Sequence, residues 1–237
     1  MNYQLISNKS DKTVVILPGW AHTSNHWSEV VKKLPNSHNY YLLDLPGFGS
    51  TSQLPNHPNI VEYTDFVFNF LSALQINQTT LVGHSFGGQI AANLTLEFPK
   101  KINKLILISP AINRKKRIGD RIKLLLAKTL KIFKFIFPKN SLEFITRSFF
   151  SSDYASSNSY QKSLLAKITN FDLSDKVSKI NLPTLIVWGS EDKTILYYGK
   201  QLHLDIDNSI LKVIYPAGHN PHLTHPDKLA KTIGNFL

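Results

Sequence analysis

Cysteine is absent from the 237-residue chain, and so are long apolar runs. The absence of cysteine excludes disulfides, thiolate metal ligands and a cysteine nucleophile, and it suits a reducing compartment. Residues 1–12 contain no apolar stretch typical of a signal peptide. No run approaches the roughly 20 apolar residues of a membrane span. We therefore expect a soluble, cytoplasmic protein.

Positive charge, in contrast, is in excess, with a formal net charge of +11. The excess is local, because residues 111–180 hold 15 of the 27 Lys and Arg residues but only 5 of the 16 Asp and Glu residues. A concentrated basic surface attracts acidic proteins, anionic lipid or nucleic acid. A compositional bias towards lysine, without any partner, accounts for the same numbers, so both interpretations stay open.

Short, nearly continuous apolar runs alternate with helix-length segments along most of the chain. Such runs are typical of strands covered on both faces, and the alternation indicates an α/β fold with a mostly parallel sheet and helices on both faces. The predicted strands are Val14–Leu17, Tyr40–Leu43, Thr79–Val82, Lys104–Ile108, Leu185–Trp188 and Leu211–Ile214, with Tyr3–Ile6 as a candidate antiparallel edge strand. The predicted helices are Asn25–Leu34, Ile60–Leu74, Phe86–Phe98, Gly199–Leu204 and Pro226–Leu237.

The alternation stops after Pro110 and resumes at Leu182. Between them, residues 111–180 show helical periodicity and no convincing strand. We therefore predict one α/β core made of residues 1–110 and 181–237, with residues 111–180 inserted as a strongly basic helical cap.

The strongest motif lies between a predicted strand and a predicted helix. Gly83-His84-Ser85-Phe86-Gly87 has the pattern G-x-S-x-G, which places a serine on a sharp strand-to-helix turn. Such a turn crowds the backbone two residues before and after the serine, and Gly83 and Gly87 relieve the crowding because neither has a Cβ. The setting predicts Ser85 as a nucleophile on an elbow.

A serine hydroxyl needs a general base within hydrogen-bond reach, and the base needs an orienting acid. With a nucleophile elbow, the acid and then the histidine follow the serine in the chain. Asp192 follows the strand Leu185–Trp188, and His219 follows the strand Leu211–Ile214, so both leave the same edge of the sheet. Glu191 is the rival acid, which we expect to face solvent.

His219, His222 and His225 are spaced three residues apart and raise the question of a metal site. Pro221 and Pro226 argue against a helix that presents them on one face, and no cysteine or carboxylate completes a ligand set. We predict no metal site and no organic cofactor. His84 is expected to project away from Ser85 and not to act as the base.

Stabilising a developing oxyanion requires two backbone N–H donors. Phe86, directly after the nucleophile, supplies one. The second is expected from the loop after the first core strand, Leu17-Pro18-Gly19-Trp20, with the Trp20 amide as the donor.

With these residues placed, the chain resembles the α/β-hydrolase superfamily over nearly its whole length. The segments LPGW, DLPGFGST, VGHSFGG, LPTLIVWGSED and PAGHNPHLTHP match that family's pattern in the right order. Within the family it resembles the carboxylesterases of biotin synthesis, which demethylate a pimeloyl-carrier-protein methyl ester. The resemblance implies the triad Ser85, Asp192 and His219, with oxyanion donors at Trp20 and Phe86 and a helical cap. Pro18 departs from the pattern, since the family usually has His-Gly before the oxyanion residue.

Residues 121–139 of the predicted cap place an apolar stripe opposite several lysines. In one interpretation the stripe covers an acyl pocket and the lysines face water. In the other the cap docks an acidic acyl-carrier protein or an anionic membrane surface. Nucleic acid is disfavoured, because no recognition motif accompanies the charge.

Together these residues predict a serine hydrolase that cleaves carboxylic esters, or thioesters, through an acyl-enzyme. A C–C bond hydrolase or a lysophospholipase on the same triad is the enzymatic alternative. A ligand-binding or receptor protein that keeps the fold but turns over little is the alternative from another class.

Overall fold

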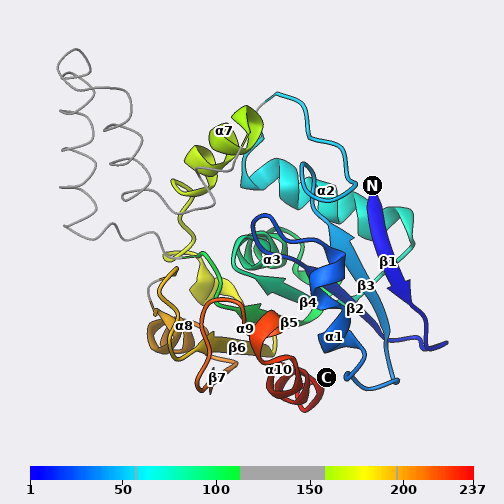
Figure 1. The fold of residues 1–237 in the computed structure, drawn as a ribbon, viewed down its shortest axis with the longest axis vertical. Helices are drawn as coiled ribbons and strands as arrows, with labels where there is room; N and C mark the ends of the chain where they lie inside the picture. Colours follow the sequence, from blue (N-terminus) through cyan, green and yellow to red (C-terminus); the bar gives the residue numbers. More distant parts are fainter. Residues whose placement is uncertain (57, 113–157, 196) are drawn as a thin grey trace.

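A seven-stranded sheet forms the centre of the computed structural model, which describes residues 1–56, 58–112, 158–195 and 197–237 (Figure 1). The strand order is β1-β3-β2-β4-β5-β6-β7, and only β1 runs antiparallel to its neighbour. This confirms the predicted fold class. The strands are β1 (Asn2–Ile6), β2 (Thr13–Leu17), β3 (Asn39–Asp44), β4 (Thr79–His84), β5 (Ile102–Ile108), β6 (Thr184–Gly189) and β7 (Ser209–Ile214).

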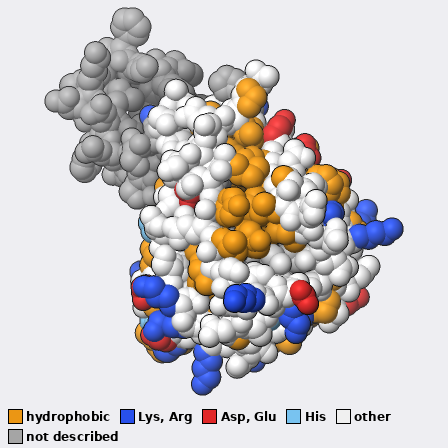
Figure 2. All heavy atoms as spheres, turned by 90° about the vertical axis from the view of Figure 1, so that its right-hand side faces the viewer, with side chains coloured by type: hydrophobic (Ala, Val, Ile, Leu, Met, Phe, Trp, Pro, Cys, Tyr) orange, Lys and Arg blue, Asp and Glu red, His pale blue; other side chains and the backbone are white. Residues whose placement is uncertain are grey.

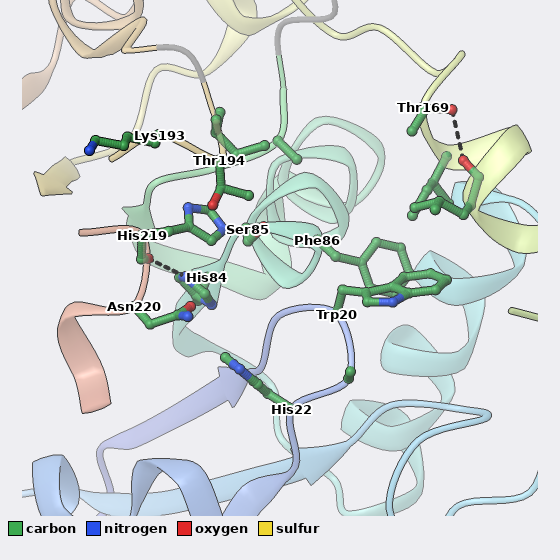
Figure 3. A pocket seen from close by; sticks show the side chains of 15 residues that line it. Trp20, His22, His84, Ser85, Phe86, Thr169, Lys193, Thr194, His219 and Asn220 are labelled. Atoms are coloured by element: carbon green, nitrogen blue, oxygen red, sulfur yellow. Dashed lines mark hydrogen bonds between the residues drawn. The ribbon is translucent and has the colours of Figure 1, made fainter. Parts of the chain in front are cut away.

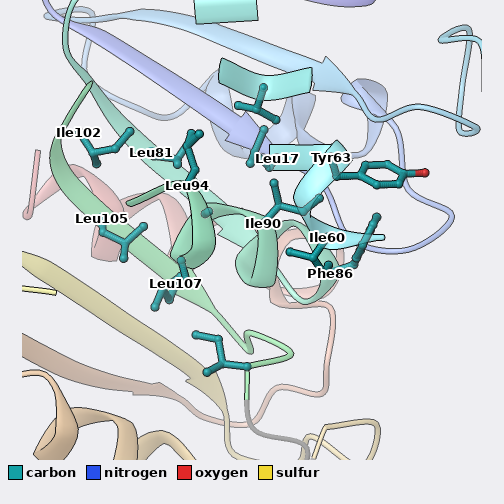
Figure 4. Close-up of a cluster of buried hydrophobic side chains, with 14 of the residues drawn as sticks. Leu17, Ile60, Tyr63, Leu81, Phe86, Ile90, Leu94, Ile102, Leu105 and Leu107 are labelled. Carbon is teal, nitrogen blue, oxygen red and sulfur yellow. The ribbon is translucent and has the colours of Figure 1, made fainter. Parts of the chain in front are cut away.

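Helices cover both faces of the sheet, because successive residues of each strand point to opposite sides. Val14 and Ile16 of β2 pack in a core with α1 (Ser28–Val31) and α10 (Pro226–Gly234). Val15 and Leu17 belong to the opposite core, with α2 (Ile60–Ala73), α3 (Phe86–Glu97) and α8 (Gly199–Asp205). Figure 4 shows strand residues of this second core, such as Leu81 and Leu105, beside Leu94 of α3. The fully apolar strands therefore reflect burial on two sides.

The prediction of a single helix over Asn25–Leu34 is wrong. It consists of a single 3-10 turn, η1 (Ser24–Trp27), followed by the one-turn helix α1. The turn is tightened by His26, whose Nδ1 accepts a hydrogen bond from the Thr23 amide at 3.0 Å. The short segment still contributes to the core, because Trp27 and Val30 are buried in the cluster between the sheet and α10.

The histidine-rich segment near the C-terminus contains a short helix that the sequence did not indicate. The sequence prediction names no helix in the segment just before Pro226, whereas Pro221–Thr224 forms the one-turn helix α9, directly before α10; of the three histidines only His222 lies within α9. Proline is tolerated at the first position of a helix, where its missing N–H has no intrahelical partner.

The sheet is built from two stretches of chain, one ending at β5 and one beginning at β6. Most of the predicted cap, residues 113–157, lies outside the described residues, and its boundaries stay a prediction. The described part contains α7 (Ser159–Ile168) and η4 (Val177–Lys179), while η2 (Pro99–Lys101) precedes β5. No helix within the described ranges combines the length and apolar composition needed to cross a bilayer.

One edge of the sheet, formed by β1, carries apolar side chains on the surface, and Figure 2 shows a band of them on this side of the molecule. Tyr3, Leu5 and Ile6 are each more than a third exposed. Tyr3 also stacks edge-on against Phe70 of α2, with ring centroids 5.3 Å apart. The band is therefore continuous with the core on the α2 side.

Asp44, the last residue of β3, is a buried carboxylate that ties three segments together. Its Oδ1 accepts from the Ser24 amide at 2.8 Å, and its Oδ2 accepts from the Asn2 side chain at 2.7 Å and the Ser50 amide at 3.2 Å. Burial raises the pKa of Asp44, but the hydrogen bonds from Ser24, Asn2 and Ser50 outweigh it, so the net pKa is lowered. The ionised form therefore anchors the start of η1 to the sheet.

We expect Asp44→Asn to lower the free energy of unfolding by about 1–3 kcal/mol at neutral pH. The NH2 group of asparagine cannot accept the hydrogen bonds that the Asp44 carboxylate accepts from Ser24, Asn2 and Ser50. The depressed pKa means that the carboxylate stabilises the fold above the unfolded Asp pKa of about 3.9, and that this contribution is lost as the pH falls through the lower folded value. Urea unfolding at several pH values measures both effects. The exposed Asp65→Asn is the matched control; equal losses in both variants would contradict this role.

Candidate active site

Ser85 lies on a strained turn between β4 and α3. Its backbone dihedrals are φ 51° and ψ −111°, a conformation that residues other than glycine rarely adopt. Backbone hydrogen bonds hold it there, because the Ser85 amide donates to the Ile108 carbonyl at 2.9 Å and the Ala111 amide donates to the Ser85 carbonyl at 3.0 Å. The predicted elbow is present in the structure.

The two glycines of the motif allow the backbones around this turn to approach closely. A Cβ on Gly83 would overlap the carbonyl oxygen of Gly87, and a Cβ on Gly87 would overlap the carbonyl oxygens of Leu17 and Pro18. The first turn of α3 therefore packs directly on the end of β2. This contact sets the position of Ser85 relative to the loop that contains Trp20.

The structure brings Ser85, His219 and Asp192 together in a hydrogen-bonded row. His219 Nε2 lies 2.9 Å from Ser85 Oγ, and His219 Nδ1 lies 2.8 Å from Asp192 Oδ2. The Asp192 side chain is fully buried and the His219 side chain is 12% exposed. Because a carboxylate only accepts, Nδ1 carries the proton and Nε2 is left as the acceptor for the serine hydroxyl.

Asp192 is held as a carboxylate. Burial raises the pKa of Asp192, but the hydrogen bonds from His219 and the Ile195 amide outweigh this, so the pKa lies below its usual value. Its Oδ1 accepts from the Thr194 and Ile195 amides at 2.9 and 3.0 Å. Glu191, the rival acid, is exposed.

The loops that carry Asp192 and His219 pack against each other. The Ser190 amide donates to the Ile214 carbonyl at 3.0 Å, and the Glu191 amide donates to the Ala217 carbonyl at 2.8 Å. A Cβ on Gly189 would overlap the backbone of Ala217 and Gly218. The ends of β6 and β7 are thus fixed together, so the acid and the base keep their separation.

The two predicted oxyanion donors flank the nucleophile. Phe86 is the first residue of α3, so its N–H lies in the first helical turn, where backbone amides have no intrahelical acceptor. Gly19 lies against the elbow, because a Cβ there would be 2.5 Å from His84 Nδ1 and 3.4 Å from Ser85 Cβ. Trp20 follows directly, and its ring lies 6.0 Å from that of Phe86.

A pocket of about 640 Å3 opens over Ser85 (Figure 3). Its walls combine apolar side chains with the polar groups of the row, and α7 contributes Leu165 and Ile168. The end of α7 is fastened to α3, since the buried Gln89 side chain donates to the carbonyls of Ile168 and Phe171 at 3.2 and 2.7 Å. The wall provided by α7 is therefore fixed relative to Ser85.

Sequence reasoning missed a group of histidines beside the elbow. It considered His219, His222 and His225 as a set, whereas the structure groups His222 with His22 and His84. These three come from distant parts of the chain, so no local spacing revealed them. His84 Nε2 lies 2.9 Å from the carbonyl oxygen of His219.

Comparisons with known proteins agree with the observed fold. The sequence model described as alpha/beta hydrolase fold matches residues 12–226. The chain is 27% identical to a pimeloyl-(acyl-carrier protein) methyl ester esterase of Wigglesworthia glossinidia brevipalpis, over 94% of this chain and 93% of that protein. It is 26% identical to the 2-hydroxy-6-oxononadienedioate/2-hydroxy-6-oxononatrienedioate hydrolase of Escherichia coli O81 (strain ED1a), over 97% and 88%.

Among solved structures, an esterase from Exiguobacterium antarcticum superposes with a TM-score of 0.76 at 23% sequence identity. The match covers 99% of this chain and 94% of that one. At this identity the likeness concerns the fold, and it extends over the whole core.

Gly87→Ala tests the close approach at the elbow. Alanine is the better helix former, by about 1 kcal/mol, but its Cβ would force α3 away from β2. We expect lower thermal stability and a loss of Ser85 reactivity towards a fluorophosphonate probe. Gly234→Ala in α10 is the control, because its Cβ would lie 3.3 Å from the nearest atom, Pro35 Cδ. A Gly87→Ala protein as stable and reactive as the control would refute the packing argument.

Proposed function

Because the chain belongs to the alpha/beta hydrolase fold family, we propose that it is a serine hydrolase that cleaves carboxylic esters through an acyl-enzyme. The observation that carries the proposal is the row of two hydrogen bonds joining Ser85, His219 and Asp192. This arrangement supplies a nucleophile, a base with its lone pair directed at the nucleophile, and an acid that fixes the tautomer of the base.

Acylation begins when His219 Nε2 takes the proton of the Ser85 hydroxyl as its oxygen attacks the ester carbonyl. The carbonyl oxygen becomes an oxyanion, which the amides of Phe86 and Trp20 stabilise. The tetrahedral intermediate collapses as His219 protonates the leaving alcohol. Asp192 stays ionised throughout and stabilises the imidazolium that forms.

Deacylation repeats the sequence with water in place of the alcohol. His219 removes a proton from water, the hydroxide attacks the acyl-enzyme, and the carboxylic acid leaves as Ser85 regains its proton. The reaction needs no external redox partner, since each step moves only protons and the acyl group.

The pocket favours an acyl group of moderate size. Trp20, Phe86, Leu165, Ile168 and Ile195 form apolar walls around the nucleophile. A medium-chain or aryl acyl group fits such walls, and a thioester is an alternative acyl donor. The relative from Wigglesworthia acts on a carrier-bound methyl ester, which supports an ester substrate for this chain.

A second candidate is C–C bond hydrolysis on the same triad, as favoured by the likeness to the E. coli hydrolase. A lysophospholipase, or a low-turnover binding protein, remains a further alternative from the sequence. A panel of p-nitrophenyl esters of increasing chain length, lysophospholipid and a dienone substrate separates these candidates by kcat/KM. Stoichiometric binding without turnover identifies the binding protein.

The basic segment, residues 111–180, is the part of the chain for which we propose a partner, because of its excess of Lys and Arg. The basic segment is proposed to dock an acidic acyl-carrier protein or an anionic membrane surface, and nucleic acid is not proposed. Its lysines Lys128, Lys131 and Lys134 lie outside the described residues.

Asp192→Asn tests the proposed mechanism. An amide in place of the carboxylate no longer holds His219 in the productive tautomer, so we expect kcat for p-nitrophenyl ester hydrolysis to fall by roughly 10³-fold or more. Glu191→Gln is the matched control, because Glu191 is the exposed neighbour of Asp192, and it should retain wild-type kcat. Similar activities for Asp192→Asn and Glu191→Gln would contradict the assigned acid.

A further inference from the structure

Beside the row of Ser85, His219 and Asp192, three histidines from distant segments form one cluster. His22 lies in the loop after β2, His84 ends β4, and His222 lies on α9. One ring nitrogen from each lies within 4.8 Å of the other two. Figure 3 shows His22 on the side of His84 that faces away from His219. We call these three residues the histidine cluster.

The hydrogen bonding of His84 leaves one of its ring nitrogens without a partner among the described residues. Burial, followed by the neighbouring His222 and His219, lowers the pKa of His84 well below its usual value, so the ring is neutral. Its Nε2 faces the His219 carbonyl oxygen, which only accepts, so Nε2 carries the single proton. Nδ1 is then a bare acceptor. It is buried and finds no hydrogen-bond partner among the described residues.

His22 and His222 add two more nitrogens at a suitable separation. His22 Nδ1 lies 3.1 Å from His222 Nε2. Two imidazoles that bind one tetrahedral zinc ion at 2.0–2.1 Å have nitrogens about 3.4 Å apart. The separation of these two nitrogens is therefore close to the edge length of such a tetrahedron. In the structure a hydrogen bond joins them.

The cluster has further features of a metal site. His222 is buried, and its Nδ1 has no hydrogen-bond partner among the described residues. Trp27 stacks on His222 with ring centroids 4.8 Å apart and fixes its plane. His22 and His84 line the pocket over Ser85, which gives an ion a path from solvent. The bond from His84 to the His219 carbonyl is the outer contact that typically orients a ligating histidine.

From this geometry we propose that His22, His84 and His222 bind one divalent transition-metal ion of the zinc class, with water completing the coordination. Imidazole ligands suit zinc, copper and nickel better than calcium or magnesium. The His84 ring, whose centroid lies 4.9 Å from that of His219, would stand between this ion and the base.

Metal binding is measured directly, independently of any activity. Metal-free protein is dialysed against Zn2+ and the bound metal is quantified, and Co2+ is titrated to detect the visible absorption of tetrahedral coordination. We expect one equivalent of Zn2+ in the wild type. His22→Gln and His222→Phe should bind at least about tenfold more weakly. His203→Ala, which changes an exposed histidine outside the cluster, should bind as the wild type does.

His222→Phe keeps an aromatic ring against Trp27. If that variant fails to fold by circular dichroism, the half-buried His22→Gln decides the question. Absence of saturable binding in the wild type would overturn the proposal, as would unchanged binding in the folded cluster variants or an equal loss in His203→Ala. These outcomes leave the proposed ester hydrolysis untouched, because no substrate enters the measurement.

Discussion

The close packing of the first turn of α3 on the ends of β2 and β4 is the constraint on which the candidate site depends. It forces Ser85 into a positive φ of 51°, and such a conformation persists only where the surrounding structure fixes it. Here Gly83 and Gly87 allow the contact, and the bonds from Ser85 to Ile108 and Ala111 hold it. The same contact brings the Trp20 loop to the nucleophile, so the hydroxyl and the expected oxyanion donors are positioned together.

The rest of the site follows from parallel strand order. The carboxyl ends of β2, β4, β6 and β7 meet at one edge of the sheet, and each continues into a loop that carries a functional candidate. The mutual packing of the β6 and β7 loops fixes Asp192 against His219. The histidine cluster lies where three of these segments converge, those at the ends of β2, β4 and β7.

Sequence patterns predicted the sheet well because strands buried on both faces leave continuous apolar runs, as Val14–Leu17 and Leu185–Trp188 show. The row of Ser85, Asp192 and His219 could be anticipated because each residue follows a strand directly. The segment after Trp20 was harder to predict, since a hydrogen bond from the Thr23 backbone amide to the His26 side chain accompanies a 3-10 turn in place of the first helical turn. The cluster of His22, His84 and His222 had no local signature, because only the tertiary fold brings the three together.

The central claim, that Ser85 is an activated nucleophile, is tested most directly by intact-mass analysis after reaction with a fluorophosphonate. The account predicts one covalent adduct in the wild type, mapped to the peptide that contains Ser85, and none in folded Ser85→Ala. An adduct that persists in Ser85→Ala would contradict the account. So would a folded wild-type protein that remains unlabelled while its pocket is open to small esters.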